Sequence, residues 1–508
     1  MKKHNVLFGI ALLTPFASQF TQAKPKSKPN IIYILADDLG RADLGAYGQQ
    51  LIETPNIDQL AREGMTFTDH YSGAPVSAPS RCSLFTGKHM GHAYIRGNDE
   101  MSERGEIGNY QAMFENSYLE GQRPIPASTI TVPQKLKEAG YHTACIGKWG
   151  LGYPGSESTP NKMGFDFFYG YNCQRQAHTY YPAFLYKNEE RVYLKNKVAS
   201  PHARLPKELD ARDPKSYEQY QQAEYAPDLM FDEIMEYVDQ RGKEPFALFW
   251  TTPIPHVPMQ ASQKWIDYYH DKFGDEEPYI GNQGYFPIRY PKASYAAMVS
   301  YLDEQVGALV EKLKAQGVYE NTLIIFTSDN GPTFSGGANS NWFDSAKPFK
   351  SEFGWGKTSV KEGGIRVPMI AVWKGKIKPN TTTDHVSAFW DIMPTLCEVV
   401  NLKSPETDGI SFLPTLTGKK QKQHEYLYWE FGEIDGAIAL RMGKWKGIIN
   451  NIYKGNREVQ LYNLELDPRE HTDVSRYHPE IVETIKEKMV EAHETPQVEK
   501  FKMFEKLF

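Results

Sequence analysis

Four continuous apolar runs recur along the chain, and each is followed by polar residues. The runs span residues 31–35, 143–146, 246–250 and 323–326. Uninterrupted apolar runs are typical of strands that are buried on both faces, as in a parallel sheet covered by helices. Ligands bind such sheets beyond the carboxyl ends of the strands. The pattern therefore predicts an α/β fold with a site where these runs end.

Helical patterns lie between the runs. We expect helices around the apolar face of Ile57, Leu60 and Ala61, after a Thr131/Gln134 capping box up to Gly140, and over 227–240 and 295–316. The segment 173–225 is long, aromatic and irregular, so it is either a substrate-facing insertion or a surface excursion. The first expected domain is a large, mostly parallel sheet sandwiched by helices, over residues 24–404.

The character of the sequence changes after about residue 404. Short aromatic or β-branched segments at 425–431, 437–441, 445–449 and 459–464 are separated by Gly or Asn, which predicts an antiparallel sheet. Ile481, Ile485 and Met489 then indicate a helix packed on it. Residues 405–508 are therefore expected to form a smaller α+β subdomain.

The first 23 residues have the pattern of a secretory signal peptide. Lys2 and Lys3 precede an apolar stretch, and a small residue, Ala23, ends the segment where a signal peptide would be cleaved. The apolar stretch is interrupted by Pro15 and is too short to span a membrane. Removing both lysines changes the formal charge from −6 to −8, which argues against nucleic acid as a partner. We therefore expect an exported protein, periplasmic or secreted, with no membrane span.

Two pairs of polar residues follow predicted strands. Asp37 and Asp38 come after the first run, and Asp329 and Asn330 come after the last. Each pair alone is typical of a strand-end turn or a helix cap. Together they offer only oxygen ligands, which suit Ca²⁺ or Mg²⁺ better than zinc.

The run SAPSRCSLFTG, residues 77–87, carries the strongest chemical signal. Pro79 fixes the local backbone, Arg81 lies one helical turn after Ser77, and a helical turn over 82–86 would favour an anion near Ser77. A serine hydroxyl is a poor nucleophile without a base or a metal. The run resembles the signature of the type I sulfatases of the alkaline phosphatase superfamily, in which the corresponding Cys or Ser is oxidised to formylglycine (3-oxoalanine).

That resemblance implies a set of site residues. Asp37, Asp38, Asp329, Asn330 and the modified Ser77 would bind one calcium ion, and Arg81 would orient the formylglycine. Lys148 in IGKWGLG, His256 in TTPIPHVP and Lys357 in GKTSVKEGGIRVP match further family elements. Both lysines would contact the sulfate, and His256 would help to protonate the leaving oxygen. Such cations suit a reaction in which charge builds on the leaving oxygen.

One position departs from the family. Where the family commonly has a histidine two residues after the lysine, this chain has Gly150. His178, in CQRQAHTYYP, is our candidate to replace that histidine or to grip a substrate hydroxyl; the alternative is an exposed loop histidine.

The resemblance implies a sulfuric ester hydrolase that removes sulfate from a glycan, with galactose or N-acetylgalactosamine in the chain. A serine precursor implies maturation by a bacterial radical enzyme. Two alternatives remain open at this point. One is a phosphodiesterase or phosphonate monoester hydrolase of the same superfamily, and the other is a non-catalytic protein that binds sulfated glycans with Ser77 unmodified.

Overall fold

The computed structural model describes Met1 and residues 28–507, and the predicted signal peptide lies outside the described residues. Its main element is an 11-stranded sheet in the order β10-β2-β9-β8-β1-β7-β3-β4-β5-β6, with β11 paired to β2. The strands are β1 (Asn30–Ala36), β2 (Met65–Tyr71), β3 (His142–Lys148), β4 (Phe167–Tyr171), β5 (Phe184–Lys187), β6 (Glu190–Tyr193), β7 (Phe246–Thr251), β8 (Thr322–Ser328), β9 (Arg366–Val372), β10 (Thr381–Thr383) and β11 (Ser387–Ala388).

The four apolar runs form the parallel centre of this sheet. They are β8, β1, β7 and β3, which are neighbours in that order and all parallel. Strands β9, β5 and β6 run antiparallel to their neighbours. The predicted fold class, a mixed and mostly parallel sheet covered by helices, is confirmed.

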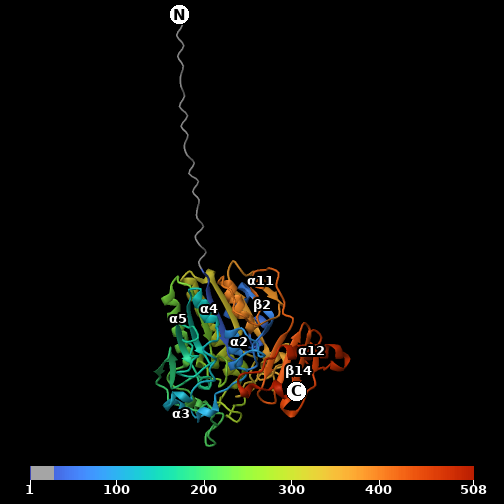
Figure 1. Cartoon of the computed structure of the whole chain (residues 1–508). Helices are drawn as coiled ribbons and strands as arrows, with labels where there is room; N and C mark the ends of the chain where they lie inside the picture. Colours follow the sequence, from blue (N-terminus) through green and yellow to red (C-terminus); the bar gives the residue numbers. More distant parts are fainter. Residues whose placement is uncertain (2–27, 508) are drawn as a thin grey trace.

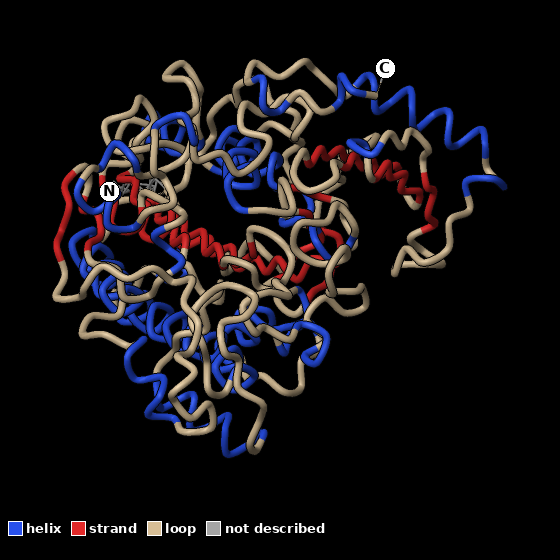
Figure 2. Tube along the Cα trace, turned by 90° about the horizontal axis from the view of Figure 1, so that it is seen from below, coloured by secondary structure: helices blue, strands red, loops and turns tan. Residues whose placement is uncertain are grey.

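Helices cover both faces of the sheet. In Figure 2 the red strands cross the molecule with blue helices on either side of them. Ile32 and Ile34 of β1 belong to one core, and Ile31 and Tyr33 belong to the other. The helices of the large domain are α1 (Pro55–Glu63), α2 (Ser77–Thr86), α3 (Tyr110–Glu115), α4 (Val132–Glu138), α5 (Ala226–Arg241), α6 (Gln263–Phe273), α7 (Pro291–Ala315), α8 (Ser340–Phe343), α9 (Glu362–Ile365), α10 (Ile392–Val399) and α11 (Leu413–Leu416). Because successive side chains of β1 point alternately into the two cores, every side chain of β1 is buried.

Helix α2 begins earlier than the sequence predicts. The expected turn over 82–86 is the end of a helix that starts at Ser77. Pro79 is accepted because it lies in the first turn, where a backbone N–H has no partner within the helix. Ser77 is therefore the first residue of α2, and not part of a loop before it.

The C-terminal part forms a second, antiparallel sheet, β12 (Leu427–Phe431), β13 (Ala437–Met442), β14 (Trp445–Asn450) and β15 (Gln460–Asn463). Helix α12 (Pro479–Glu491) packs on one face through Ile485 and Met489. The other face, with Trp429 and Ile448, packs against Tyr71 and Trp390 of the large domain. The α+β character is confirmed, whereas the boundary at residue 404 stays a prediction. Figure 1 shows this part beside the large domain.

Two further observations concern the described residues. All four cysteines are buried and free. No helix among the described residues is both long and apolar enough to span a bilayer.

Candidate active site

The two polar pairs meet at one edge of the sheet. Strands β1 and β8 are parallel, with Ala36 opposite Ser328, so the residues that follow them emerge side by side. The backbone N–H of Asp38 donates to Oδ1 of Asp329 at 3.2 Å, and Asn330 Nδ2 donates to Oδ1 of Asp38 at 2.8 Å. Asp38 has a φ of 66°, a sparsely populated region for a non-glycine residue. Strain of this kind is common at functional sites.

Helix α2 brings Ser77 and Arg81 to the same edge. Ser77 Oγ donates to Asp37 Oδ1 at 3.1 Å. The Arg81 guanidinium, fully buried, lies 3.0 Å from Asp329 Oδ2 and 3.5 Å from Asp37 Oδ2. It also donates to the carbonyl oxygen of Lys148 at 2.6 Å. Arg81 thereby links the helix to the ends of strands β1, β3 and β8.

Two lysines and a histidine complete the cluster. Lys148, the last residue of β3, places Nζ 2.5 Å from Asp37 Oδ2 and 3.4 Å from Ser77 Oγ. Lys357 Nζ lies 2.7 Å from Asp38 Oδ2, and His256 Nε2 lies 3.6 Å from the same oxygen. His256 Nδ1 faces the carbonyl oxygen of Val257 at 2.6 Å, so Nδ1 carries a proton and Nε2 faces the site.

Burial controls the titration of these groups. Burial raises the pKa of Asp329 to about 6, with a further contribution from Asp37, despite the nearby Arg81. The pKa of Asp38 is also raised, by burial, although Lys357 opposes the shift. Burial lowers the pKa of Lys148, and Asp37 only partly opposes this. Burial also acts to raise the pKa of Asp37, but Lys148, His256 and Arg81 outweigh it and hold that pKa well below its ordinary value. Asp38 and Asp329 therefore lack enough positive charge around them, which favours an added cation.

The donor set suits a hard divalent cation. The side chains of Asp37, Asp38 and Asp329 are fully buried, and Asn330 Oδ1 is buried without a hydrogen-bond partner among the described residues. An unsatisfied buried oxygen is costly unless something binds it. Three carboxylates and an amide oxygen are ligands that Ca²⁺ or Mg²⁺ prefers. The residues therefore fit the expected metal.

His178 joins the cluster from the irregular segment. It ends the 3₁₀ helix η5 (Gln176–His178), and its ring stacks on that of His256, with centroids 5.0 Å apart and planes at 7°. Burial lowers its pKa well below the ordinary value, and the nearby His256 lowers it further, so the ring is neutral at pH 7. Its Nδ1 has no hydrogen-bond partner among the described residues. His178 is therefore a half-buried part of the cluster and not an exposed loop histidine.

Two further aromatic rings, of Tyr285 and His202, neighbour this pair without a sequence signal that predicts them. Tyr285 packs edge-on against His178 and His256, with centroid distances of 5.3 and 5.9 Å, and His202 lies 5.1 Å from Tyr285. Neither belongs to a recognisable motif. For His202 the one available signal is the aromatic content of the 173–225 segment, which suggests that part of this segment faces the site.

The space beside Gly150 is filled by another side chain. Gly150 has a φ of 86°, and a Cβ there would lie 2.2 Å from Gln174 Nε2. Because the left-handed backbone strains other residues and Gln174 occupies the adjacent space, glycine is favoured at this position. Gln174 Nε2 is buried without a hydrogen-bond partner among the described residues. Gln174 thus takes up the room that a histidine at position 150 would need.

All ten residues predicted for the site lie in this one cluster or in direct contact with it. They are Asp37, Asp38, Ser77, Arg81, Lys148, His178, His256, Asp329, Asn330 and Lys357.

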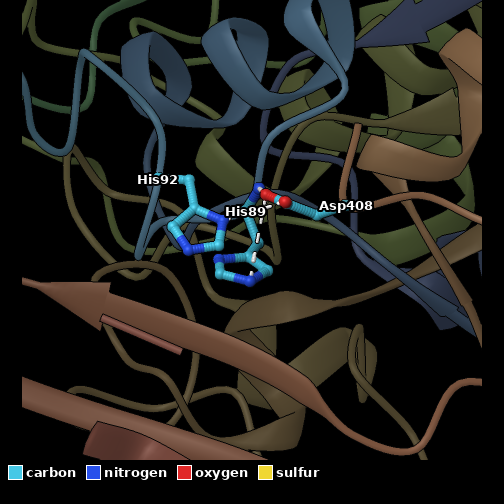
Figure 3. A group of neighbouring side chains, drawn as sticks. All are labelled: His89, His92 and Asp408. Atoms are coloured by element: carbon cyan, nitrogen blue, oxygen red, sulfur yellow. Dashed lines mark hydrogen bonds and ion pairs between the residues drawn. The ribbon is translucent and has the colours of Figure 1, made fainter. Parts of the chain in front are cut away.

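A second group of titratable residues lies away from the cluster (Figure 3). Asp408 accepts from the backbone N–H of His89 at 2.9 Å and faces Nδ1 of His92 at 2.8 Å. His89 Nδ1 accepts from the Gly91 N–H, so in the neutral ring the proton sits on Nε2, and that nitrogen has no lone pair for a metal. The group therefore joins the loop after α2 to the segment before β12.

The chain is an ester hydrolase with an α/β fold of the alkaline phosphatase type. A model of the Sulfatase family matches residues 29–402, and a model described as N-sulphoglucosamine sulphohydrolase, C-terminal, matches residues 351–495. The chain belongs to the sulfatase family and is a sulfuric ester hydrolase.

Relatives of known identity align over most of the chain. It is 28% identical to an N-acetylgalactosamine-6-O-sulfatase of Bacteroides thetaiotaomicron, over 95% of this chain and 97% of that protein. It is 29% identical to human arylsulfatase A, over 94% and 89% of the two chains. Among solved structures, Ps i-CgsB superimposes with a TM-score of 0.71 at 27% identity, covering 93% of this chain and 94% of the other.

Proposed function

We propose that this sulfatase removes sulfate from a sulfated carbohydrate, using Ser77 oxidised to formylglycine and one calcium ion. The observation that carries the proposal is the place of Ser77, at the start of α2, with its Oγ 3.1 Å from Asp37 and 3.4 Å from Lys148 Nζ. The relative from Bacteroides is an N-acetylgalactosamine-6-O-sulfatase, and Ps i-CgsB has been solved with k-i-k-neocarrahexaose. The first supports an N-acetylgalactosamine-containing glycan, one of the two sugars that we propose alongside galactose, and the second supports an oligosaccharide substrate.

The chain's own residues would bind the anionic group and move the proton. Formylglycine at position 77 would supply an aldehyde hydrate as nucleophile, and the cation held by the three aspartates and Asn330 would favour its ionised form. Lys148 and Lys357 lie on either side of the carboxylates and would hold the sulfate oxygens.

His256 is placed to protonate the leaving oxygen. Its Nδ1–H is fixed by the Val257 carbonyl, so Nε2 is the nitrogen that can exchange a proton with substrate. Burial and Lys357 keep its pKa well below the ordinary value, and a bound anion would raise it. A pKa that rises when the anionic group binds suits a general acid.

The alternative hydrolase activity is known on the same fold. A phosphonate monoester hydrolase from Agrobacterium radiobacter has the same fold, with a TM-score of 0.61 at 19% identity. Turnover of an aryl sulfate and of the matching aryl phosphate ester separates the two activities. Faster release of phosphate would show that this site prefers the phosphate ester and would overturn the proposed carbohydrate sulfate substrate.

We further propose that the protein is exported to the periplasm or secreted and that a radical maturase oxidises Ser77. The predicted signal peptide and the serine at position 77 support this.

Metal removal should abolish activity reversibly. Dialysis against a calcium chelator is expected to lower sulfate release to about 1% or less, because the buried carboxylates would lose the charge that balances them. Readdition of Ca²⁺ should restore activity and raise the melting temperature, since the metal binds only the folded state. Sulfate release and thermal unfolding with and without Ca²⁺ test this. Full activity in a sample shown to contain no divalent metal would contradict it.

His178 is expected to bind substrate and not to carry the chemistry. His178→Ala should raise KM about tenfold with a smaller change in kcat, because its half-buried ring would contact a part of the substrate that is bound equally in ground and transition states. Steady-state kinetics on the preferred sulfated sugar give both constants. His202→Ala is the matched control, since His202 contacts His178 but lies at the exposed rim. Unchanged KM and kcat in His178→Ala would remove the residue from the site.

A further inference from the structure

A groove of about 240 Å³, lined by both polar and apolar side chains, lies between the two domains. One wall is the segment 353–361, which carries Lys357, and the other is the turn between β12 and β13 with the end of β14. Its lining includes Phe353, Thr358, Glu433, Ile434 and Asp435.

Hydrogen bonds connect both walls of the groove to the segment around Ser77. Thr358 directly follows Lys357, and its N–H donates to the carbonyl oxygen of Pro75 at 3.0 Å. On the opposite wall, Glu433 Oε1 accepts from the backbone N–H of Asn98 at 2.5 Å, and Asn98 Oδ1 accepts from the N–H of Ala78 at 3.2 Å. The small domain therefore reaches the residue next to Ser77 through one intermediate side chain.

Two large apolar side chains that line this groove are exposed. Phe353 is 67% exposed and Ile434 is 57% exposed. Phe353 rests edge-on against Phe334, with centroids 5.3 Å apart, which fixes the ring while leaving most of its surface open. A single exposed apolar residue needs no explanation, but two in one groove beside a site indicate a binding surface.

The backbone of both walls is strained. Thr358 and Ile434 have φ values of 69° and 58°, and they are the two β-branched residues with positive φ in the part of the chain that the structure describes. This conformation is a true outlier for a β-branched residue. It persists where the surroundings impose it, as in ligand clamps.

We propose that this groove binds the sugar residues linked to the sulfated one, so that the substrate is an oligosaccharide or longer glycan. This inference rests on the proposed function. Phe353 would stack against the apolar face of a sugar ring, and Glu433 and Asp435 would accept hydrogen bonds from its hydroxyls. Glu433 has a second carboxylate oxygen for this purpose, because Asn98 uses only Oε1.

The test compares two substrates that share the same sulfated sugar. One is a sulfated monosaccharide chosen as the best of a panel that includes N-acetylgalactosamine 6-sulfate, and the other is an oligosaccharide that ends in it. Phe353→Ala should lower kcat/KM for the oligosaccharide about fivefold more than for the monosaccharide, the loss expected for one stacking contact. Glu433→Gln, which keeps the acceptor for Asn98, should change the ratio in the same direction. Tyr477→Ala, at another aromatic residue that is 62% exposed, is the control.

The outcomes separate the inference from the function on which it rests. An equal loss on both substrates, or none on either, in active Phe353→Ala enzyme would overturn the groove and leave the sulfatase proposal intact. Wild-type protein with verified formylglycine that releases sulfate from no member of the panel would overturn the proposed function, and the groove with it.

Discussion

Ser77→Ala is expected to abolish sulfate release, by about 10⁴-fold or more, while the protein stays folded. The reason is that alanine cannot be oxidised to the aldehyde that the proposed reaction needs, whereas the ion pairs of Arg81 with Asp37 and Asp329 hold the start of α2 without the serine hydroxyl. Ser77 loses only one hydrogen bond to Asp37 and a long contact with Lys148. Initial rates on the sulfated sugar and a thermal melt measure both expectations.

Ser83→Ala is the matched control on the same helix. Its hydroxyl is buried without a hydrogen-bond partner among the described residues, so the substitution removes no interaction of the site. Near wild-type turnover in Ser83→Ala, beside loss in Ser77→Ala, would assign the effect to position 77. Substantial activity in Ser77→Ala would show that the nucleophile lies elsewhere.

The mass of the tryptic peptide that covers residues 63–81 tests the modification itself. Oxidation of the serine hydroxymethyl group to an aldehyde removes two hydrogens, about 2 mass units. An unshifted peptide in fully active protein would exclude formylglycine. An unshifted peptide in inactive protein that binds sulfated glycans would instead support the binding-protein alternative.

The sequence predicts the centre of the fold and site because both depend on one regular element. Continuous apolar runs define parallel strands, and parallel strands bring their carboxyl ends to one edge. That rule alone places Asp37, Lys148, His256 and Asp329 together. The start of helix α2 is harder to predict, because a proline such as Pro79 usually argues against a helix and is tolerated only in its first turn.

The rest depends on contacts that no local pattern encodes. Gln174 was not recognised because its role is to occupy the space beside Gly150, a contact between distant loops. Glu433 lies in a turn of the small domain, and only the packing of the second sheet on the first brings it to Asn98. Irregular segments carry no periodicity, so their approach to the site becomes visible only in three dimensions.

The packing of the two sheets also depends on a buried charge network. Lys446 of β14 lies 2.8 Å from Glu362 and 3.0 Å from Glu470, and all three side chains are inaccessible to solvent. Glu362 begins α9, five residues after Lys357, and also pairs with Arg366 at 2.9 Å. The network therefore joins the small domain to the segment that holds a predicted sulfate-binding lysine.

Lys446→Met is expected to destabilise the protein by about 3–5 kcal/mol, the usual loss when one partner of a buried ion pair is removed. Methionine fills most of the volume, so the loss reports charge and not a cavity. Two buried carboxylates would remain, with the Glu362 N–H donating to Glu470 at 2.8 Å and no lysine between them. Urea unfolding followed by tryptophan fluorescence measures the change. Lys444→Met, at an exposed residue of the same hairpin, should change stability little.

The pH dependence of this loss distinguishes charge from packing. In the native network burial raises the pKa of Glu362, but Lys446 and Arg366 outweigh it and hold the pKa at about 2. A depressed pKa contributes stability above the unfolded value and loses it as the pH falls through the folded value. Without Lys446 the carboxyl group of Glu362 or Glu470 takes up a proton more easily in the folded protein. The destabilisation should therefore be larger at about pH 8 than at about pH 5. A loss that is independent of pH would assign the effect of Lys446→Met to packing alone.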